Sequence, residues 1–323
     1  GCCSNFGWSV SLDSAGNIVA ISAPFGGVAG HVRIYENISG SWFQVGLDID
    51  GENPGDQSGS SVSLSSDGNT VAIGARLNDG NGSNSGHVRL YTKISNPTLG
   101  TWSWSQTGQD IDGESANDKS GNSVSLSSDG SIVAIGATGN DDNGINSGHV
   151  RLYTKISNPT LGTWSWSQTG QDIDGSSGGD GFGRLVSLSS DGSIVAISGG
   201  GVKIFENLSG LWTQKGQDLN EAGHSISLNS DGSIVACGDP GDYVNGTDPC
   251  YVTVFNVSTL STCVGCTDSL ALNYDPTVTM DDGSCIYPSG CTDSLALNYN
   301  SSANTDDGSC IYCVYGCMDS LAL

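Results

Sequence analysis

The sequence predicts an all-β fold in which one small sheet is repeated about five times. The stretch GSSVSLSSDGNTVAIGA from Gly59 returns in four more versions, and the copies start near residues 6, 59, 121, 182 and 223. In each copy an alternating Val-Ser-Leu type run and a second apolar run flank a Gly-containing turn, which is Ser-Asp-Gly in four copies. Short alternating runs joined by such turns are typical of β-hairpins.

Each copy continues with further predicted strands. The third strand is GHVRIY from Gly30 in the first copy, and its equivalents begin at Gly86, Gly148, Val202 and Tyr251. A fourth strand, built on a Trp and a Gln, begins at Trp42, Trp104, Trp166 and Trp212, and the fifth copy lacks it. Four short strands per repeat predict the blades of a β-propeller, which we place at residues 1–262.

Two sets of equivalent residues invite a functional interpretation. His31, His87 and His149 occupy the same place before the third strand. Three equivalent positions cannot all form one active site, so a structural role is favoured. The Trp residues of the fourth strands are likewise expected to pack in the core or between blades rather than to stack on sugars. Trp102 and Trp164 lie in inserted segments and are better candidates for surface contacts.

The repeats resemble those named for their Phe-Gly and Gly-Ala-Pro ends, which occur in integrin alpha-subunit propellers and in many secreted microbial and algal proteins. The motifs that carry the resemblance are Phe6-Gly7, Ser22-Ala23-Pro24, Gly74-Ala75 and Gly136-Ala137. This resemblance implies an extracellular β-propeller used for adhesion or assembly. Many blades of that family carry a calcium loop between the first two strands, where this chain has only a short turn such as SSDG.

Composition excludes several classes of partner. The chain has 10 basic and 34 acidic residues, a formal net charge of −24. Nucleic acids and anionic membrane surfaces are poor partners for such a field, and solubility is the simplest reason for it. No apolar run is long enough to span a bilayer, so membrane insertion is not expected.

The register changes after the repeats, and residues 263–323 form a Cys-rich tail. Two units, 265–289 and 290–315, share the pattern GCTDSLALNY…DDGSC, and a third, 316–323, is truncated. Units of this size cannot bury a sufficient core and need covalent links. The tail resembles short Cys repeats near the C-termini of secreted marine microbial proteins, where they act as stalks or attachment modules.

The chain has 11 cysteines. Equal spacing favours the pairs Cys266–Cys285 and Cys291–Cys310, although pairing between neighbouring units is an alternative. Cys237 and Cys250 flank neighbouring strands of the fifth copy and are a third expected pair. A zinc site at Cys310 and Cys313 is disfavoured because no second ligand pair is near. Disulfides predict an extracellular location, secreted or at the cell surface.

Acidic loops follow the Trp strands. In DIDGENPGD the carboxylates stand at positions 1, 3, 5 and 9, a spacing that can converge on a hard cation. The loop lacks a bidentate Glu at position 12, and a solvated acidic linker with Asx turns is the alternative. The candidate calcium ligands are Asp48, Asp50, Glu52, Asp56, Asp110, Asp112, Glu114 and Asp118.

Six sequons offer N-glycosylation sites, although a sequence this rich in Asn, Ser and Thr would contain a similar number by chance. Those after the third strands are expected at loop tips, where a glycan would face solvent. The six are Asn37, Asn81, Asn207, Asn245, Asn256 and Asn300.

No nucleophile and base stand in a catalytic pattern, so we expect a protein that is not an enzyme. The predicted function is an extracellular structural subunit that self-assembles into a filament or cell-surface appendage through the propeller edge and the tail. Copies of the same chain are its expected partners, and no cofactor is required. The alternative is a calcium-dependent carbohydrate-binding or adhesion module, with glycans as partners.

Overall fold

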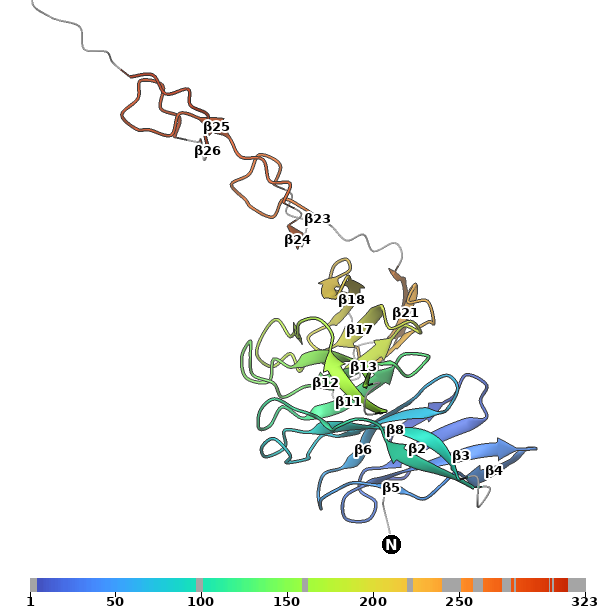
Figure 1. The fold of residues 1–323 in the computed structure, drawn as a ribbon. Coiled ribbons are helices and arrows are strands. Elements are labelled where there is room, and N and C mark those ends of the chain that lie inside the picture. Colours follow the sequence, from blue (N-terminus) through green and yellow to red (C-terminus); the bar gives the residue numbers. More distant parts are fainter. Residues whose placement is uncertain are drawn as a thin grey trace, which may run out of the picture. The chain divides into compact units, whose positions relative to one another are not determined.

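The computed structural model describes residues 5–96, 101–158, 162–219, 223–239, 251–257, 264–274, 280–281, 283–301, 303 and 305–312. Within these residues the regular elements are β-strands, and the sheets follow one another along the sequence (Figure 1). The chain divides into two units, residues 1–260 and 261–323. Over the described residues, no helix has the length and apolar character needed to cross a membrane.

The first three blades share one plan, a four-stranded antiparallel sheet with a two-residue strand paired to its third strand. Blade one contains β1 (Val10–Leu12), β2 (Ile18–Ala23), β3 (His31–Ile38), β4 (Ser41–Gln44) and the short β5 (Ile49–Asp50). Blade two contains β6 (Ser58–Leu64), β7 (Thr70–Ala75), β8 (His87–Asn96), β9 (Thr101–Gln106) and the short β10 (Ile111–Asp112). Blade three contains β11 (Ser120–Leu126), β12 (Ile132–Ala137), β13 (His149–Asn158), β14 (Thr163–Gln168) and the short β15 (Ile173–Asp174).

The last two blades are simpler. Blade four contains β16 (Leu185–Leu188), β17 (Ile194–Ser198), β18 (Val202–Leu208) and β19 (Leu211–Gln214). Blade five contains β20 (Ser225–Leu228), β21 (Ile234–Asp239) and β22 (Tyr251–Asn256). The prediction of an all-β propeller with five blades is confirmed, and the described residues of the fifth sheet form three strands.

The turn between the first two strands shows how the sequence specifies the blade. In blade two the Asp67 carboxylate accepts hydrogen bonds from the Ser65 hydroxyl and the Asn69 backbone N–H, at 2.6 and 2.9 Å. Gly68 has φ of +66°, a conformation that favours glycine. A Cβ there would stand 2.5 Å from the Ile18 side chain of blade one. The turn therefore connects the first two strands of its own blade and also contacts the preceding blade.

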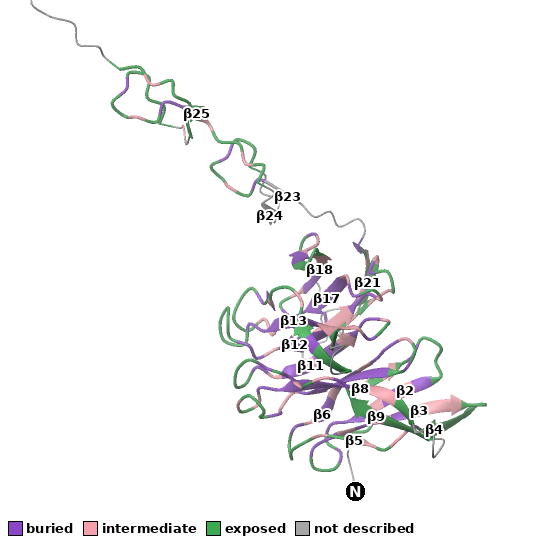
Figure 2. Cartoon of the chain, viewed as in Figure 1, coloured by how far each residue is buried: buried purple, intermediate pink, exposed green. Residues whose placement is uncertain are grey.

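The cores of the propeller lie between blades. We call the side of a blade that packs on the next blade its forward face, and the opposite side its backward face. Between blades one and two, the forward face contributes Ile18, Ala20, Val32 and Ile34, and the backward face contributes Val62, Leu64, Val71 and Ile73. Equivalent clusters fill the next three interfaces. The purple burial colour therefore marks β11 and β12 of blade three, whereas β4 is green (Figure 2).

Two rows of hydrogen bonds also cross each interface. In one, a Leu backbone N–H donates to a Ser hydroxyl of the preceding blade, as from Leu126 to Ser63 at 3.0 Å. In the other, which we call the serine ladder, a turn N–H donates to a turn carbonyl of the next blade, as from Ser66 to Ser128 at 2.8 Å. The ladder runs through Ser14, Ser66, Ser128, Ser190 and Ser230, and all its donors point toward the next blade.

The second unit has little secondary structure. Parallel two-residue pairs join β23 (Val264–Gly265) to β24 (Met280–Asp281), and β25 (Ser289–Gly290) to β26 (Thr305–Asp306). Disulfides link Cys266 to Cys285 and Cys291 to Cys310, each within one unit. In the first Cys repeat, 265–289, the Asn273 side chain also bridges the Ser284 carbonyl and the Ile286 N–H. Leu270 and Leu272 remain exposed, so covalent and polar links hold a unit that buries little.

Candidate functional site

The backward face of blade one and the forward face of blade five are uncovered. Val10 and Leu12 of β1 are 62% and 58% exposed, whereas their equivalents in blade two are 6% and 7% exposed. Side chains that form an interblade core elsewhere therefore meet solvent here. Trp42 of the same face is also exposed, although its equivalents Trp166 and Trp212 are buried.

Blade five repeats this contrast on its other side. Val252 and Val254 of β22 are 71% and 62% exposed, and Ile234 of β21 is also exposed. The equivalent positions on the forward face of blade one, Val32 and Ile34, are fully buried. The two uncovered faces are thus the two different halves of the interface that the molecule forms four times internally.

The hydrogen-bonding groups of these faces are complementary as well. By alignment with the other blades, blade five presents the Ser227 hydroxyl as an acceptor and the Ser230 N–H as a donor. Blade one presents the Leu12 N–H as a donor and the Ser14 carbonyl as an acceptor. Among the described residues these groups have no partner blade. The Ser227 and Ser230 side chains are exposed.

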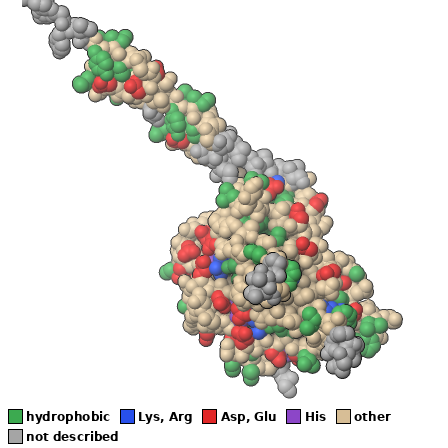
Figure 3. All heavy atoms as spheres, in the orientation of Figure 1, with side chains coloured by type: hydrophobic (Ala, Val, Ile, Leu, Met, Phe, Trp, Pro, Cys, Tyr) green, Lys and Arg blue, Asp and Glu red, His purple; other side chains and the backbone are tan. Residues whose placement is uncertain are grey.

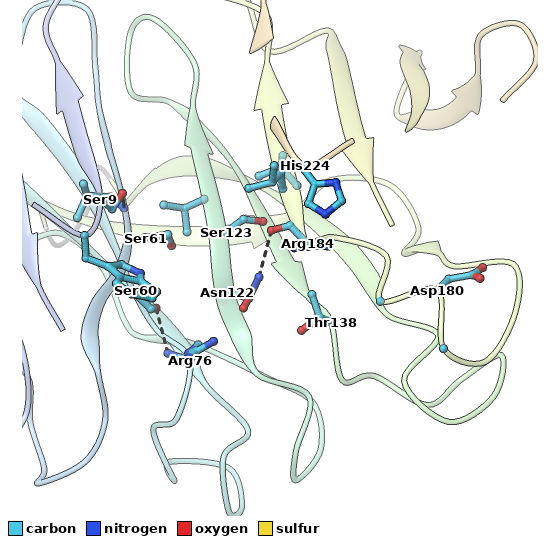
Figure 4. A pocket seen from close by; sticks show the side chains of 17 residues that line it. Ser9, Ser60, Ser61, Arg76, Asn122, Ser123, Thr138, Asp180, Arg184 and His224 are labelled. Atoms are coloured by element: carbon cyan, nitrogen blue, oxygen red, sulfur yellow. Dashed lines mark hydrogen bonds between the residues drawn. The ribbon is translucent and has the colours of Figure 1, made fainter. Parts of the chain in front are cut away.

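A pocket of about 830 Å³ lies where the first strands of all five blades converge (Figure 4). Its lining is polar and includes Ser60, Asn122, Arg184 and His224. The Asn122 side-chain amide donates to the Arg184 carbonyl at 3.1 Å, which ties blade three to blade four. In the described lining, the His224 ring has no hydrogen-bonded carboxylate or hydroxyl. The pocket therefore shows no nucleophile and base held together.

The three predicted histidines stand at the start of the third strands, beside the short strands that follow each blade. His87 and His149 are 1% exposed, and His31 is half-buried. In register, His31 lies opposite Asp50 and His149 lies opposite Asp174. Burial, assisted by the neighbouring Arg89 and Arg151 guanidinium groups, lowers the pKa of His87 and His149 to about 4. Both rings are neutral at physiological pH.

The predicted calcium loops do not bring their own four carboxylates together. Asp48 forms a two-pronged ion pair with Arg33, whose hydrogen bonds lower the pKa of the Asp48 carboxyl. Asp56, which is 2% exposed, accepts hydrogen bonds from the Asn53 N–H and the Asn78 amide. In blade three, Asp118 accepts hydrogen bonds from the Glu114 and Ser115 N–H groups. These carboxylates close their own loops or pair with arginine.

Instead, acidic residues gather around the histidines, from one loop at His31 and from successive loops at His87 and His149. Within the described chain, three groups have ligand atoms within 4.8 Å of one another. The first contains His31, Asp48 and Asp50, the second contains Glu52, His87 and Asp110, and the third contains Glu114, Asp142, His149 and Asp172. Asp112 lies 4.0 Å from the His87 Nδ1. Calcium binding by the loops remains a prediction.

Sequence reasoning missed Asp142. It lies in the loop between β12 and β13, and the nearly identical loop of blade two has Gly80 at the same position. The difference between NDGNGSNS and NDDNGINS was the available signal. Around it, burial and the carboxylates of Asp172 and Asp142 raise the pKa of Glu114, while Arg151 opposes this effect.

The Asn side chains of the sequons differ in their hydrogen bonds and in their exposure. Asn37 and Asn207 stand at the ends of the third strands, and each accepts a turn hydrogen bond through its Oδ1. The Asn81 amide nitrogen donates to the Gly113 and Glu114 carbonyls, at 2.8 and 2.9 Å. A glycan on Asn81 would weaken this link between loops. Asn256 and Asn300 are exposed, and Asn245 lies outside the described residues.

Other predicted positions are placed as follows. Cys237 is buried in the core between blades four and five, and Cys250 lies outside the described residues. Trp104, Trp166 and Trp212 pack between blades, and the indole N–H of Trp166 donates to the Thr107 carbonyl of blade two at 2.8 Å. Trp102 and Trp164 are exposed, and each has a lysine ammonium over its ring. Acidic side chains are spread over the visible surface (Figure 3).

Comparison with known proteins identifies the repeat. Residues 48–91 and 111–153 match the FG-GAP repeat, so the predicted resemblance is confirmed for these two stretches. No curated protein sequence matches the chain.

The chain is similar to several solved structures at low sequence identity. A candidate 6-phosphogluconolactonase from Bacteroides fragilis is 13% identical, with a TM-score of 0.50 over 77% of this chain and 67% of its own. A second from Bacteroides uniformis is 12% identical, with a TM-score of 0.47 over 76% and 71%. Hydrazine synthase from Kuenenia stuttgartiensis is 13% identical, with a TM-score of 0.44 over 78% and 64%. At such identity, the likeness to the first of these shows the fold alone.

Proposed function

From a chain that carries FG-GAP repeats in a five-blade propeller, we propose an extracellular structural subunit that assembles head to tail with copies of itself. The observation that carries the proposal is the pair of uncovered end faces on blades one and five. The assembly is a filament or cell-surface appendage, with the disulfide-linked tail as a second attachment element. The proposal assigns the chain no catalytic reaction.

The occupant of each end face is a second copy because the two faces complement each other and not themselves. The forward face of blade five offers Val252, Val254 and Ile234. Their counterparts in blade one cover Val62 and Leu64, which are the blade-two equivalents of Val10 and Leu12. Each large apolar side chain that passes from solvent into such an interface contributes about 1.5–3 kcal/mol. Several such side chains on each face provide the driving force for association.

Hydrogen bonds then set the direction. A second copy that places its Leu12 N–H on Ser227 and its Ser14 carbonyl on Ser230 would continue both rows of interblade bonds without a break. Two copies joined through identical faces would continue neither row, because each row needs its donor from one face and its acceptor from the other. Contacts between unlike surfaces propagate into open assemblies when they do not close.

The first experiment measures the mass of the purified full-length chain over a wide range of concentrations by sedimentation and electron microscopy. We expect growth with concentration and its loss in Leu12→Asp, which places a charge on the backward face of blade one. Val28→Asp is the matched control, because Val28 is 77% exposed on a loop of the same blade. A wild-type chain that stays monomeric at high concentration would overturn the proposal.

A second experiment tests the polarity by disulfide trapping. In the interface of blades two and three, the hydroxyls of Ser66 and Ser128 are 2.7 Å apart, so equivalent positions on the end faces suit a cysteine pair. A mixture of Ser14→Cys and Ser230→Cys chains should form a new intermolecular disulfide, and either variant alone should not. Trapping of a double variant only within one chain would show that the end faces close on each other, contrary to the proposal.

A further inference from the structure

The third acidic group, Glu114, Asp142, His149 and Asp172, differs from the other two in containing four potential ligands. Its members come from separate segments of the fold. Glu114 follows β10, Asp142 lies between β12 and β13, His149 begins β13, and Asp172 precedes β15. A ligand held by all four would connect the segment that precedes blade three in the sequence, the loop between β12 and β13, and the segment before β15.

The His149 ring is directed into this group. It is 1% exposed, and its Nδ1 has no hydrogen-bond partner in the described structure. The same atom lies 3.8 Å from Glu114 Oε2 and 3.7 Å from Asp172 Oδ2. These separations are too long for hydrogen bonds. They are close to the spacing of two ligands that share one ion at the 2.0–2.2 Å bond lengths of zinc.

Blade two provides an internal comparison. There Glu52 and Asp110 approach His87 in the same way, with Asp110 Oδ2 3.8 Å from the His87 Nδ1. Gly80 replaces the fourth ligand. The arginines are matched as well, because Arg89 lies 3.4 Å from Glu52 and Arg151 lies 3.3 Å from Glu114. Asp142 therefore adds a carboxylate that the group in blade two lacks, whereas Asp112 approaches the His87 Nδ1 to 4.0 Å in blade two.

Charge also favours a cation in blade three. Glu114, Asp142 and Asp172 gather three carboxylates, and Arg151 is the cation paired with one of them. A divalent ion would balance the remaining charge. Without such an ion, three carboxylates this close together repel one another.

We propose that Glu114, Asp142, His149 and Asp172 form a binding site for one divalent transition-metal ion, with zinc as the best fit. An imidazole nitrogen together with carboxylate oxygens suits zinc, whereas calcium takes six to eight oxygen ligands. The site is structural, since it joins the segment after β10 to the loop before β13 and to the segment before β15. It is separate from the end faces and independent of assembly.

The experiment titrates zinc into the chelator-treated, oxidised full-length chain at physiological ionic strength with excess calcium and magnesium. Calorimetry and metal analysis after dialysis should both give one zinc ion per chain. Cobalt should bind in its place and develop visible absorption bands of a low-symmetry nitrogen and oxygen site. Zinc should also raise the unfolding temperature of the chain.

Matched variants identify the site. Glu114→Gln and Asp142→Gly should weaken zinc binding by roughly ten-fold or more, because each removes a ligand. Glu52→Gln removes the equivalent carboxylate of blade two and should leave zinc affinity unchanged. Asp142→Gly reproduces the sequence of blade two, so its fold is expected to be retained, and circular dichroism checks this.

Two outcomes would overturn the proposal. One is a wild-type chain that retains no zinc after dialysis. The other is zinc binding of equal strength in wild type, Glu114→Gln and Glu52→Gln, which would place the ion elsewhere, such as on tail cysteines.

Discussion

The four internal interfaces and the two end faces are built from the same repeat but lie in opposite environments. Leu90 on the forward face of blade two is fully buried, and Val254 at the equivalent position of blade five is 62% exposed. The difference arises from the neighbour and not from the residue type. The repeat therefore encodes half of an interface on each face of every blade. Among the described residues, the backward face of blade one and the forward face of blade five are the two halves without a partner blade.

The largest expected effect compares these equivalent positions. Leu90→Ala should destabilise the chain by about 2–5 kcal/mol, because it leaves a cavity between blades two and three. Val254→Ala should change the stability of the dilute chain by less than about 0.5 kcal/mol. Urea unfolding at low protein concentration measures both. Similar losses for the two variants would mean that the end face is covered in solution even when the chain is dilute.

The second prediction concerns the buried histidines of the interior blades. The folded pKa of His87 and of His149 is about 4, below the unfolded value of 6.5. The unfolded chain therefore takes up protons first, and stability that is complete above pH 6.5 should fall as pH decreases toward 4. The loss is on the order of 3 kcal/mol for each ring.

Unfolding free energies measured between pH 7 and pH 4, with a chelator present, check this dependence. The His87→Asn and His149→Asn double variant should have a flatter profile than the wild type over the same range. An unchanged slope in the double variant would assign the acid sensitivity to other groups.

The smallest expected change in stability comes from removing one interblade hydrogen bond, which we compare between an internal interface and an end face. Ser63→Ala removes the acceptor of the Leu126 N–H and should cost about 1 kcal/mol. Ser227→Ala makes the same change on the free forward face and should leave the dilute chain unaffected. In the assembled state, the Ser227 variant should show a higher critical concentration. If both variants behave alike at every concentration, the two positions are not equivalent.

Most of the fold could be predicted from the sequence because its signals are local. The alternation of Val-Ser-Leu, the Ser-Asp-Gly turn and the Trp strand each specify one strand or turn within a few residues. Their fivefold recurrence then predicts the architecture. The sequence also predicted that blade five lacks a Trp strand, since no Trp-Gln pattern follows Tyr251.

The short strands and the acidic groups could not be predicted in the same way. Ile49 and Asp50 form a strand only because they pair with Val32 and His31, so tertiary contact decides their conformation. The loop spacing suggested that carboxylates of one loop would converge. In the structure, Glu114 meets Asp172 and His149, which lie in later segments of the chain. Ligand sets that combine successive repeats leave no spacing signal within one loop.

The serine ladder gives the molecule a direction. Every donor from Ser14 to Ser190 points toward the next blade, so the series begins with an acceptor and ends with a donor. A fibre that continued this series would have two chemically distinct tips, one with the Ser14 carbonyl and the Leu12 N–H and the other with the Ser230 N–H and the Ser227 hydroxyl. Its tips would then elongate at different rates, and a capping peptide that fits one tip would arrest growth there while the other continued to extend.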